Sequence, residues 1–377
     1  MVLLLKPKDK KIDHWLLLSV SLLILLGSIM VYSSSSAIAQ NAMTEDGRKF
    51  SSHAFFLKRQ IIYLVLAYIV MYLAIRIDLE KARKLIFPGL ILAFALLIIV
   101  YIPNPIRGTH RWLSTGFFTF QPSEIFKYMI LFYLAHSLSQ KGRSLDNLKL
   151  YIWPYGPILL AGTLLIVFEP DLGSILVLGT TVIILLYLAG ARLNHLAIAI
   201  GGSAIAVYLL VFIAGYKKSR VLDFFDWMAD PMQAPHQVKQ SVLSIANGGI
   251  WGTGLGNGIF KQFFLPEPHT DFIFASIGEE LGLLGLIITL GLFYAVIWRG
   301  FRIASGQPDK FRYLLASGLI LCLAINICIN IAVVLGLIPT TGLPLPFLSF
   351  GGSSLVVSAA AVGLLLNLSR WQVRRVQ

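Results

Sequence analysis

Charged residues are scarce in this sequence. Asp, Glu, Lys and Arg make up 13% of its 377 residues, whereas soluble globular proteins contain about 25%. Acidic residues are the scarcest, with 18 Asp and Glu against 31 Lys and Arg, while hydrophobic residues reach 57%. This composition excludes an ordinary soluble domain and indicates a protein whose main solvent is the lipid bilayer.

Cysteine is almost absent as well. Cys322 and Cys328 lie in one apolar run, so neither a disulfide framework nor a thiolate metal site is indicated, and both are interpreted as apolar packing residues. The sequence also lacks C-x-x-C, H-E-x-x-H and Walker A motifs. The glycine-rich stretch 252–258 misses the G-x-G-x-x-G spacing, so we interpret it as a flexible turn between segments at the membrane surface.

Long apolar runs dominate the rest of the chain. Ten are long enough to cross roughly 30 Å of hydrocarbon, which predicts an all-α polytopic membrane protein with ten transmembrane helices. The first run imitates a signal peptide, but its length and the runs after it favour an uncleaved helix. The ten runs cover residues 15–32, 60–76, 85–103, 123–138, 151–168, 172–190, 194–214, 272–298, 313–338 and 352–369.

The basic residues predict the orientation. They gather before the first run, after every second run and at the end of the chain, which is always the same side of a ten-helix layout. By the positive-inside rule this side is cytoplasmic, and both termini lie there. Topology and attraction to anionic lipids account for most of the net charge of +13, so no nucleic-acid partner is predicted.

One connection is unusually long. Residues 215–271 form an extracytoplasmic loop between the seventh and eighth helices, too apolar and aromatic to be disordered. Helical spacing of apolar residues predicts a short amphipathic helix at the interface over Pro235–Ala246, with Gln240 among its polar residues. A basic and aromatic cluster that includes Lys217 and Arg220 follows the seventh helix. It is either a juxtamembrane anchor or a clamp for a lipid phosphate.

Ionisable side chains at membrane depth are costly and mark candidate sites. The stretch Leu265–Phe272 places Glu267, His269 and Asp271 at the mouth of the eighth helix. On residue chemistry alone, Asp271 is either a functional carboxylate or a first-turn residue that starts the helix.

The loop before the fourth helix adds two basic residues, Arg107 and Arg111. Glu124 then opens that helix, where the helix dipole favours a carboxylate. Glu124 and Lys127 are three residues apart and share a face, so they could form an ion pair that is structural or part of a site.

Further polar groups interrupt the apolar runs. Glu169 and Asp171 lie at the outer end of the fifth helix, and the adjacent Glu279 and Glu280 lie about two turns into the eighth, where they need a cation, a partner or a proton. Segment 339–354, which contains Ser353, is irregular backbone at membrane depth and must be buried or line a cavity. Most of these groups fall at the outer face, which indicates a chamber open to the outside and to the outer leaflet.

Seven blocks of sequence, in order along nearly the whole chain, closely resemble the SEDS family (shape, elongation, division and sporulation), which includes RodA and FtsW. The glycine block and Lys261 are closer to the division branch. Phe350 and Phe263 depart from the family pattern, which usually has Tyr and often an acidic residue there. The blocks are Arg111–Trp112, Gln121–Glu124, Glu169–Gly173, Gly254–Asn257, Leu265–Phe274, Gly278–Gly282 and Pro339–Phe347.

The resemblance implies one transmembrane domain over residues 1–377 that acts as a peptidoglycan glycosyltransferase. Such an enzyme polymerises lipid II into glycan strands at the outer face of the bacterial cytoplasmic (inner) membrane. The implied partners are lipid II, the growing glycan strand, a class B penicillin-binding protein and other divisome or elongasome membrane proteins. The family's essential aspartate corresponds to Asp271.

This chemistry needs a base for the attacking hydroxyl and cations for the departing pyrophosphate. Asp271 is the predicted base, and His269 is the rival because imidazole titrates near neutral pH. Arg111, Lys127, Lys217 and Arg220, or a divalent cation such as Mg²⁺ or Mn²⁺, would stabilise the leaving group. The full set of predicted substrate-binding residues is Arg107, Arg111, Glu124, Lys127, Lys217, Arg220, Gln240, Lys261, Glu267, His269, Glu280 and Ser353.

Two other classes of function stay open at this point. A lipid II flippase would move the lipid without forming bonds, and it would explain the many spans and the buried Glu279 and Glu280. A scaffold that only recruits a synthase would be inactive and would tolerate substitution of Asp271 by Asn.

Overall fold

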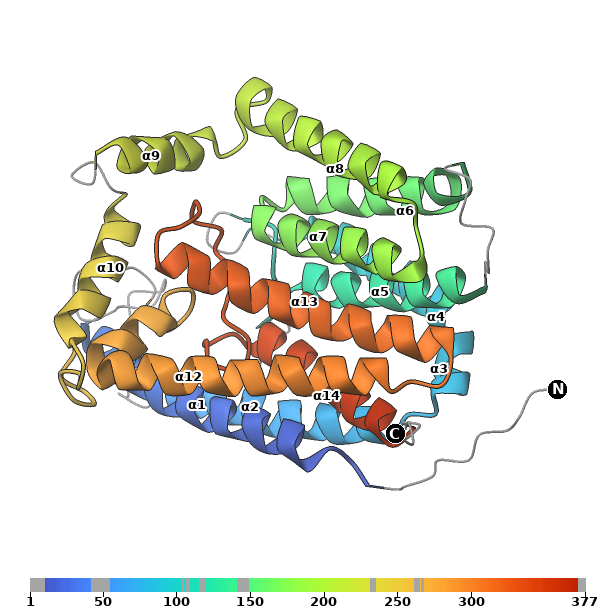
Figure 1. Ribbon diagram of the computed structural model, residues 1–377. Coiled ribbons are helices and arrows are strands. Elements are labelled where there is room, and N and C mark those ends of the chain that lie inside the picture. The colour runs from blue at the N-terminus through green and yellow to red at the C-terminus, as the bar shows by residue number, and fades with distance from the viewer. Residues whose placement is uncertain are drawn as a thin grey trace.

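The computed structural model describes residues 11–41, 55–103, 105, 109–114, 119–140, 149–230, 235–260, 265 and 268–371. The described chain is mostly helical, with one two-stranded antiparallel sheet that pairs β1 with β2 (Figure 1). The elements are α1 (His14–Asn41), α2 (Phe55–Arg76), α3 (Leu79–Lys84), α4 (Ile86–Ile99), β1 (Leu113–Ser114), β2 (Thr119–Phe120), α5 (Pro122–Gln140), α6 (Lys149–Phe168), α7 (Leu172–Ala189), α8 (Leu193–Tyr208), the π-helix η2 (Leu209–Ile213), α9 (Lys218–Ala229), α10 (His236–Gly248), α12 (Ile273–Ser305), α13 (Lys310–Val334) and α14 (Gly352–Ser369).

Each predicted apolar run overlaps one of these helices. Among the described residues, 7 helices are long and apolar enough to cross a membrane: α1, α2, α7, α8 with η2, α12, α13 and α14. The apolar helices Ile86–Ile99 and Tyr155–Phe168 are shorter. The all-α membrane architecture is therefore confirmed, while the count of ten crossings stays a prediction.

The helices run side by side, with α9 and α10 at one end of the bundle and the C-terminus at the other (Figure 1). Helix α13 packs against α5, α7 and α12, α14 packs against α2, and α1 against α12. Burial is uneven, since 72% of the apolar window of α14 is buried but only 11% of that of α8. Helix α8 therefore offers most of its apolar surface to the surroundings.

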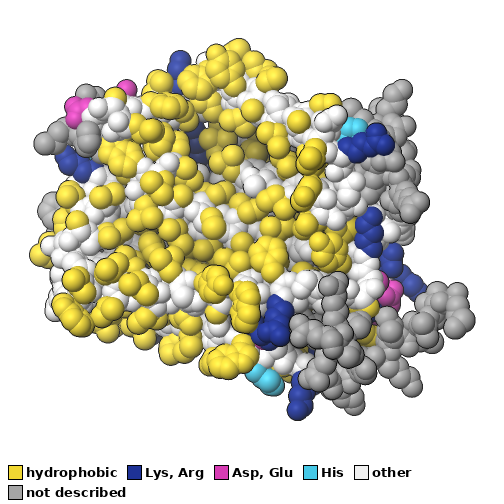
Figure 2. All heavy atoms as spheres, in the orientation of Figure 1, with side chains coloured by type: hydrophobic (Ala, Val, Ile, Leu, Met, Phe, Trp, Pro, Cys, Tyr) yellow, Lys and Arg dark blue, Asp and Glu magenta, His cyan; other side chains and the backbone are white. Residues whose placement is uncertain are grey.

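The surface agrees with this arrangement. Figure 2 shows hydrophobic side chains over most of the visible face, and most of its Lys and Arg side chains lie toward the end that holds the C-terminus. An exposed apolar belt with charge at its margin is typical of a membrane protein.

Helix α2 ends against α14. Its last carbonyl groups have no partners within the helix, and the Asn367 amide of α14 donates to the carbonyls of Ala74, Ile75 and Ile77 at 3.2, 3.0 and 2.7 Å. A buried polar residue of α14 thus satisfies the end of the helix that α14 packs against.

Helix α12 is broken at Gly282, whose φ of 65° and ψ of −164° are not helical. Segment 249–254 fills the break. Leu283 and Leu284 donate their backbone N–H groups to Gly249 and Ile250, at 2.9 and 3.4 Å, while Thr253 donates to the Glu279 carbonyl at 2.9 Å. The glycine-rich stretch is therefore bonded to α12, and its interpretation as a mere flexible turn is incomplete.

Three features were not expected from the sequence: the short helix α3, the helix α9 and the β1–β2 hairpin. Of the two cysteines interpreted as apolar packing residues, Cys322 is buried and Cys328 is exposed on α13. A helix that is apolar all round does not reveal which of its faces contacts protein and which contacts lipid.

Candidate active site

Asp271 lies in the turn just before α12 and is half-buried. It lines a cavity of about 80 Å³ together with Arg220 of α9 and Gln237 of α10. The Asn330 amide of α13 fixes the backbone here, since it donates to the carbonyls of Asp271 at 2.9 Å and of Leu343 at 2.6 Å.

The irregular segment 339–350 packs against the backbone just before Asp271. The Ser349 hydroxyl donates to the Thr270 carbonyl at 2.6 Å, and the Phe350 N–H donates to the His269 carbonyl at 2.8 Å. The segment has no regular structure as far as Gly351, and its residues 340–343 line the Asp271 cavity. Irregular backbone that lines a cavity was predicted over residues 339–354; the prediction holds as far as Gly351 and is wrong for residues 352–354, which form the start of α14.

His269 is placed differently from Asp271. Its side chain is only 5% exposed, and its ring lies 5.7 Å from the Phe350 ring. His269 is not among the residues that line the Asp271 cavity.

Three cations lie near one another and contact backbone carbonyls, and one of them, Arg220, lines the Asp271 cavity. Arg111 donates through Nε to the Glu169 carbonyl at 2.7 Å and also reaches the Pro170 carbonyl. Lys217 Nζ donates to the same Pro170 carbonyl at 2.6 Å, and Arg220 Nη1 donates to the Thr340 carbonyl at 3.1 Å. Within the described parts of the chain, none of the three forms a salt bridge with a carboxylate.

These cations affect one another. Burial, Arg111 and Arg220 lower the pKa of Lys217 to about 8. Burial and Arg111 also lower the pKa of Arg220, against the opposing effect of the Asp271 carboxylate. Because an anion would relieve this repulsion, we call Arg111, Lys217 and Arg220 the cation cluster and regard it as a candidate anion site.

Glu169 contributes no charge to the cluster at neutral pH. Its side chain is fully buried, and neither carboxyl oxygen has a hydrogen bond of ordinary geometry among the described residues, although the Ser123 hydroxyl lies close enough to lower the pKa of Glu169 slightly. Burial and the neighbouring Asp171 raise the pKa of Glu169 to about 9, so this carboxyl group is protonated at pH 7.

Asp171, the other member of this acidic pair, accepts several hydrogen bonds. It accepts hydrogen bonds from Gln121 Nε2 and Ser174 Oγ, both at 2.7 Å, and its side chain caps α7 through the Ser174 N–H. The two neighbouring carboxyl groups therefore differ because one is buried without hydrogen bonds of ordinary geometry and the other is surrounded by donors.

Glu124 and Lys127 form the predicted ion pair, with 2.9 Å between Nζ and Oε1 and both side chains at most 3% exposed. The pair lies within α5, and neither residue lines the Asp271 cavity. Lys127 is thereby separated from the three cations with which the sequence had grouped it.

Glu279 and Glu280 find partners within the protein. The Glu279 carboxylate accepts from the N–H groups of Ile259 at 2.7 Å and Phe260 at 3.1 Å. Glu280 accepts from the Ser33 hydroxyl at 2.8 and 2.7 Å and from the Gly256 N–H at 3.0 Å. The sequence predicted that these carboxylates need a cation, a partner or a proton, and the structure supplies hydrogen-bond partners.

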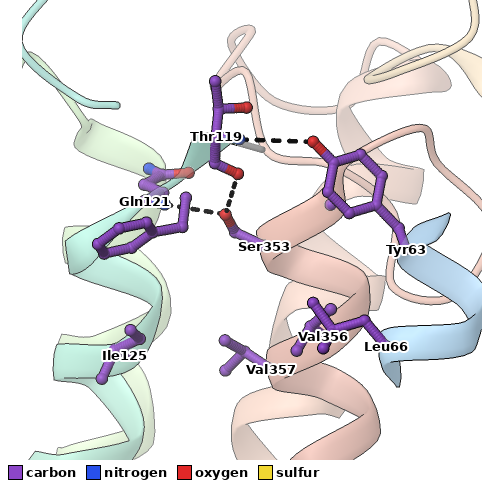
Figure 3. Close-up of a pocket in the computed structure, with 10 residues that line it drawn as sticks. Tyr63, Leu66, Thr119, Gln121, Ile125, Ser353, Val356 and Val357 are labelled. Atoms are coloured by element: carbon purple, nitrogen blue, oxygen red, sulfur yellow. Dashed lines mark hydrogen bonds between the residues drawn. The ribbon is translucent and has the colours of Figure 1, made fainter. Parts of the chain in front are cut away.

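Ser353 belongs to a different cavity, between α2, α5 and α14 (Figure 3). Its hydroxyl accepts from the Gln121 N–H at 2.9 Å and donates to the Thr119 carbonyl at 3.2 Å, while Tyr63 accepts from the Thr119 N–H at 3.5 Å. This cavity is about 130 Å³ and its remaining lining is apolar. Its contacts tie the hairpin to the start of α14.

The other predicted residues either do not line the Asp271 cavity or lie outside the described residues. Gln240 is half-buried on α10 but does not line the Asp271 cavity. Arg107, Lys261, Glu267 and Phe263 lie outside the described residues.

Sequence reasoning missed several residues of the Asp271 cavity, namely Gln237, Thr340 and Thr341. Gln237 lies on the polar side of the predicted amphipathic helix, and this was the available signal. Among the described residues, no three His, Cys, Asp or Glu side chains gather closely enough to hold a metal ion, so the predicted divalent cation stays an expectation.

The sequence profile of the family described as "Cell cycle protein", which covers FtsW, RodA and SpoVE, matches residues 13–373. The chain belongs to this family. A relative from Geobacter sulfurreducens, named a probable peptidoglycan glycosyltransferase FtsW, is 40% identical over 364 residues, which cover 96% of this chain and 95% of the relative. The stage V sporulation protein E of Bacillus subtilis is 39% identical over 363 residues, covering 95% and 97%.

Solved structures of relatives share the fold. A chain from a study of polymerization and crosslinking by a peptidoglycan synthase complex matches with a TM-score of 0.75 at 27% identity, covering 96% of this chain and 99% of the other. The rod shape determining protein RodA of Thermus thermophilus matches with a TM-score of 0.67 at 25% identity, covering 96% and 98%. The identification made from the sequence blocks is therefore confirmed.

Proposed function

We propose that this chain is a single-domain, ten-helix peptidoglycan glycosyltransferase that polymerises lipid II at the outer face of the bacterial inner membrane, with both termini in the cytoplasm. Membership of a family whose members are named peptidoglycan glycosyltransferases supports the activity. The position of Asp271 in a cavity beside a cation cluster supports the mechanism. That juxtaposition is the observation on which the proposal mainly rests.

In the proposed reaction, the 4-hydroxyl oxygen of an incoming sugar attacks the anomeric carbon of the lipid-linked chain. A carbon–oxygen bond forms on one face while the bond to the polyprenyl pyrophosphate breaks on the other, so the configuration inverts. Asp271 accepts the hydroxyl proton, and the pyrophosphate leaves with the bonding electrons. Arg111, Lys217 and Arg220 stabilise its charge, because positively charged donors that are already in place need little reorganisation.

Asp271 is favoured over His269 as the base. The carboxylate lines a cavity and is half-buried, whereas His269 is only 5% exposed and lies outside that cavity. A base must come within hydrogen-bonding distance of the hydroxyl that it deprotonates. Accessibility thus outweighs the better match of imidazole to neutral pH.

A class B penicillin-binding protein is the proposed partner. The solved structure with the highest TM-score quoted above comes from a complex that coordinates polymerization and crosslinking. A chain that only polymerises would need such a crosslinking enzyme beside it. Other divisome or elongasome membrane proteins would join this pair.

The test uses the purified protein, with its crosslinking partner, and fluorescent lipid II. The wild type should produce glycan ladders on a gel, and Asp271→Asn should lower the rate by at least about 10²-fold because it removes the base. Asp226→Asn on α9 is the matched control. Asp226 is exposed and lines neither the Asp271 cavity nor the two neighbouring cavities beside α9 and α10. Full-length glycan from Asp271→Asn would falsify the mechanism, and lipid II transfer across vesicles without ladders would favour the flippase.

A further inference from the structure

Three neighbouring cavities, linked by shared lining residues, form a path that ends at Asp271. The first, about 590 Å³, shares Phe224 and Val238 with the second, which is about 210 Å³. The second shares Arg220, Gln237 and Thr340 with the Asp271 cavity of about 80 Å³. The first two cavities are lined by residues of α9 and α10, and these helices lie at the end of the bundle opposite the C-terminus (Figure 1).

The first cavity is a wide, mostly apolar groove, which we call the α9–α10 groove, and Lys239 is the one charged residue in its lining. Trp227 and Met228 of α9 form one wall, and Val242 and Leu243 of α10 form the other. Met228, Leu243 and Val242 are 67%, 43% and 39% exposed, so the groove is open to the surroundings of the protein.

Gly336 forms the floor of the groove. Its φ is +72°, and a Cβ atom there would lie 2.2 Å from Cη2 of Trp227 and 2.8 Å from Cγ1 of Val238. Only glycine adopts this conformation readily and lets the indole rest on the backbone. The groove is thus a shaped feature of the turn after α13.

Polarity reverses along the path. Beyond Phe224 and Val238, the second cavity is lined by Arg220, Asp223 and His236, and the third by Asp271 and Asn330. Arg220 lies in both of these polar cavities and belongs to the cation cluster. A ligand that fills the whole path must therefore have a hydrocarbon part, an anionic part and a polar, hydroxyl-rich part, in that order.

We propose that the α9–α10 groove holds the polyprenyl chain of a lipid-linked sugar pyrophosphate, with the pyrophosphate at Arg220 and the sugar at Asp271. This inference rests on the proposed function and adds to it the place where one lipid-linked substrate binds. The order of chemical groups in such a substrate matches the order of the three cavities. Charge complementarity at Arg220 and continuity with the Asp271 cavity favour this occupant over a segment of a partner protein.

The groove would act by orienting the substrate more than by holding it tightly. Lipid tails are as apolar as the groove, so a prenyl chain gains little hydrophobic free energy by moving into it from the bilayer. The gain would come from packing against Trp227 and Leu243 and from the direction in which the chain leaves the pyrophosphate. Filling the groove should therefore raise KM several-fold and leave kcat almost unchanged.

The test compares two tryptophan substitutions on one helix. Val242→Trp places an indole in the groove, and Ala246→Trp, at an exposed position of α10 outside the groove, is the control. We expect Val242→Trp to raise KM for lipid II with a long polyprenyl chain by roughly three- to tenfold. With lipid II that carries one or two isoprene units, the two variants and the wild type should have the same KM.

A binding measurement keeps this inference separate from the proposed function. Lipid II with a photoreactive group in the first isoprene units should crosslink to peptides of α9 and α10, even in Asp271→Asn, and the yield should fall in Val242→Trp but not in Ala246→Trp. Crosslinks confined to other helices would overturn the groove assignment and leave the role of Asp271 standing. Unchanged crosslinking with loss of partner binding in Val242→Trp would also overturn it, because the groove would then be a protein-docking surface.

Discussion

Lys217 is the member of the cation cluster whose charge changes nearest to neutral pH. Its pKa of about 8 lies below the ordinary lysine value of 10.5 because of burial and two neighbouring guanidinium groups. The side chain is therefore charged below pH 8 and neutral above it. Since the unfolded chain keeps its proton up to about 10.5, the contribution of Lys217 to stability rises with pH between these two values.

The effect of pH on catalysis should be opposite to its effect on stability, because catalysis needs the charged form of Lys217. If the ammonium stabilises the departing pyrophosphate, kcat/KM of the wild type should fall as the pH rises through about 8, since kcat/KM reports groups of the free enzyme. Lys217→Arg should lose this fall, because a guanidinium stays charged. The neighbouring Lys218→Arg is the control and should keep the wild-type profile. Initial rates between pH 6.5 and 9.5 would check this, and identical profiles for all three proteins would remove Lys217 from the mechanism.

At the scale of single residues, the sequence indicated the chemistry of the site better than its geometry. Asp271, Lys217 and Arg220 could be selected because ionisable groups are costly near a membrane. Gln237 and Thr340 could not, because polar uncharged residues are common in loops and only the fold brings them to Asp271. Lys127 was grouped with the other cations although its spacing from Glu124 also predicted the ion pair that forms, because the sequence left open whether that pair is structural or part of a site.

At the scale of elements, the break in α12 connects the long loop to the site. Segment 249–254 is bonded to residues on both sides of Gly282, and the carboxylates of Glu279 and Glu280 hold the backbone of residues 256–260. The chain then continues to Asp271. We infer that the break fixes the start of the segment that presents the proposed base.

Gly282→Ala should therefore disturb both stability and polymerisation. A Cβ atom there would lie 2.4 Å from the Gly252 nitrogen, at a φ of +65°, so we expect a loss of about 1–3 kcal/mol. Gly291→Ala in the same helix is the control, since its Cβ atom would meet nothing within 4 Å, and it should cause no loss of stability. Thermal unfolding in detergent and limited proteolysis of residues 249–260 would measure the effect. Equal melting temperatures for the two variants would show that the loop does not depend on the break.

The elements could be predicted where hydrophobicity is strong and continuous. The ten apolar runs each overlap a helix, because a chain in lipid must satisfy its backbone hydrogen bonds internally. Helix α9 was missed because its charged residues, Lys218, Arg220 and Asp223 among them, look like loop sequence. The two-residue strands β1 and β2 are too short for any periodicity to show.

At the scale of the whole molecule, the distribution of charge agrees with a fixed orientation in the membrane. Most Lys and Arg side chains on the face shown in Figure 2 lie toward the C-terminal end. The Asp271 cavity is bounded by α9 and α10, which lie at the opposite end (Figure 1). An active site at that end would face the compartment where lipid-linked sugars are polymerised, while the basic end would face the anionic cytoplasmic leaflet.

The shortest helix of the ten-helix layout is α4. It has 14 residues, which span about 21 Å at 1.5 Å per residue, less than the roughly 30 Å of a hydrocarbon core. The chain extends α4 at both ends, through Leu85 and α3 on one side and the turn from Val100 to Ile102 on the other. Because Ile102 is 79% exposed and apolar, we expect this turn to lie in the outer interfacial layer and complete the crossing.

Single cysteines placed on either side of α4 test this expectation in a cysteine-free background. Lys81→Cys and Ile102→Cys flank the helix, and both native side chains are exposed. A membrane-impermeant maleimide added to spheroplasts should label Ile102→Cys only, and permeabilised cells should give both products. Ser219→Cys on α9 and Ser305→Cys at the end of α12 serve as outer and inner references, because α12 is long enough to cross by itself. If Lys81→Cys and Ile102→Cys react alike in spheroplasts, α4 does not cross, and the side assigned to Asp271 would have to be counted again from α5.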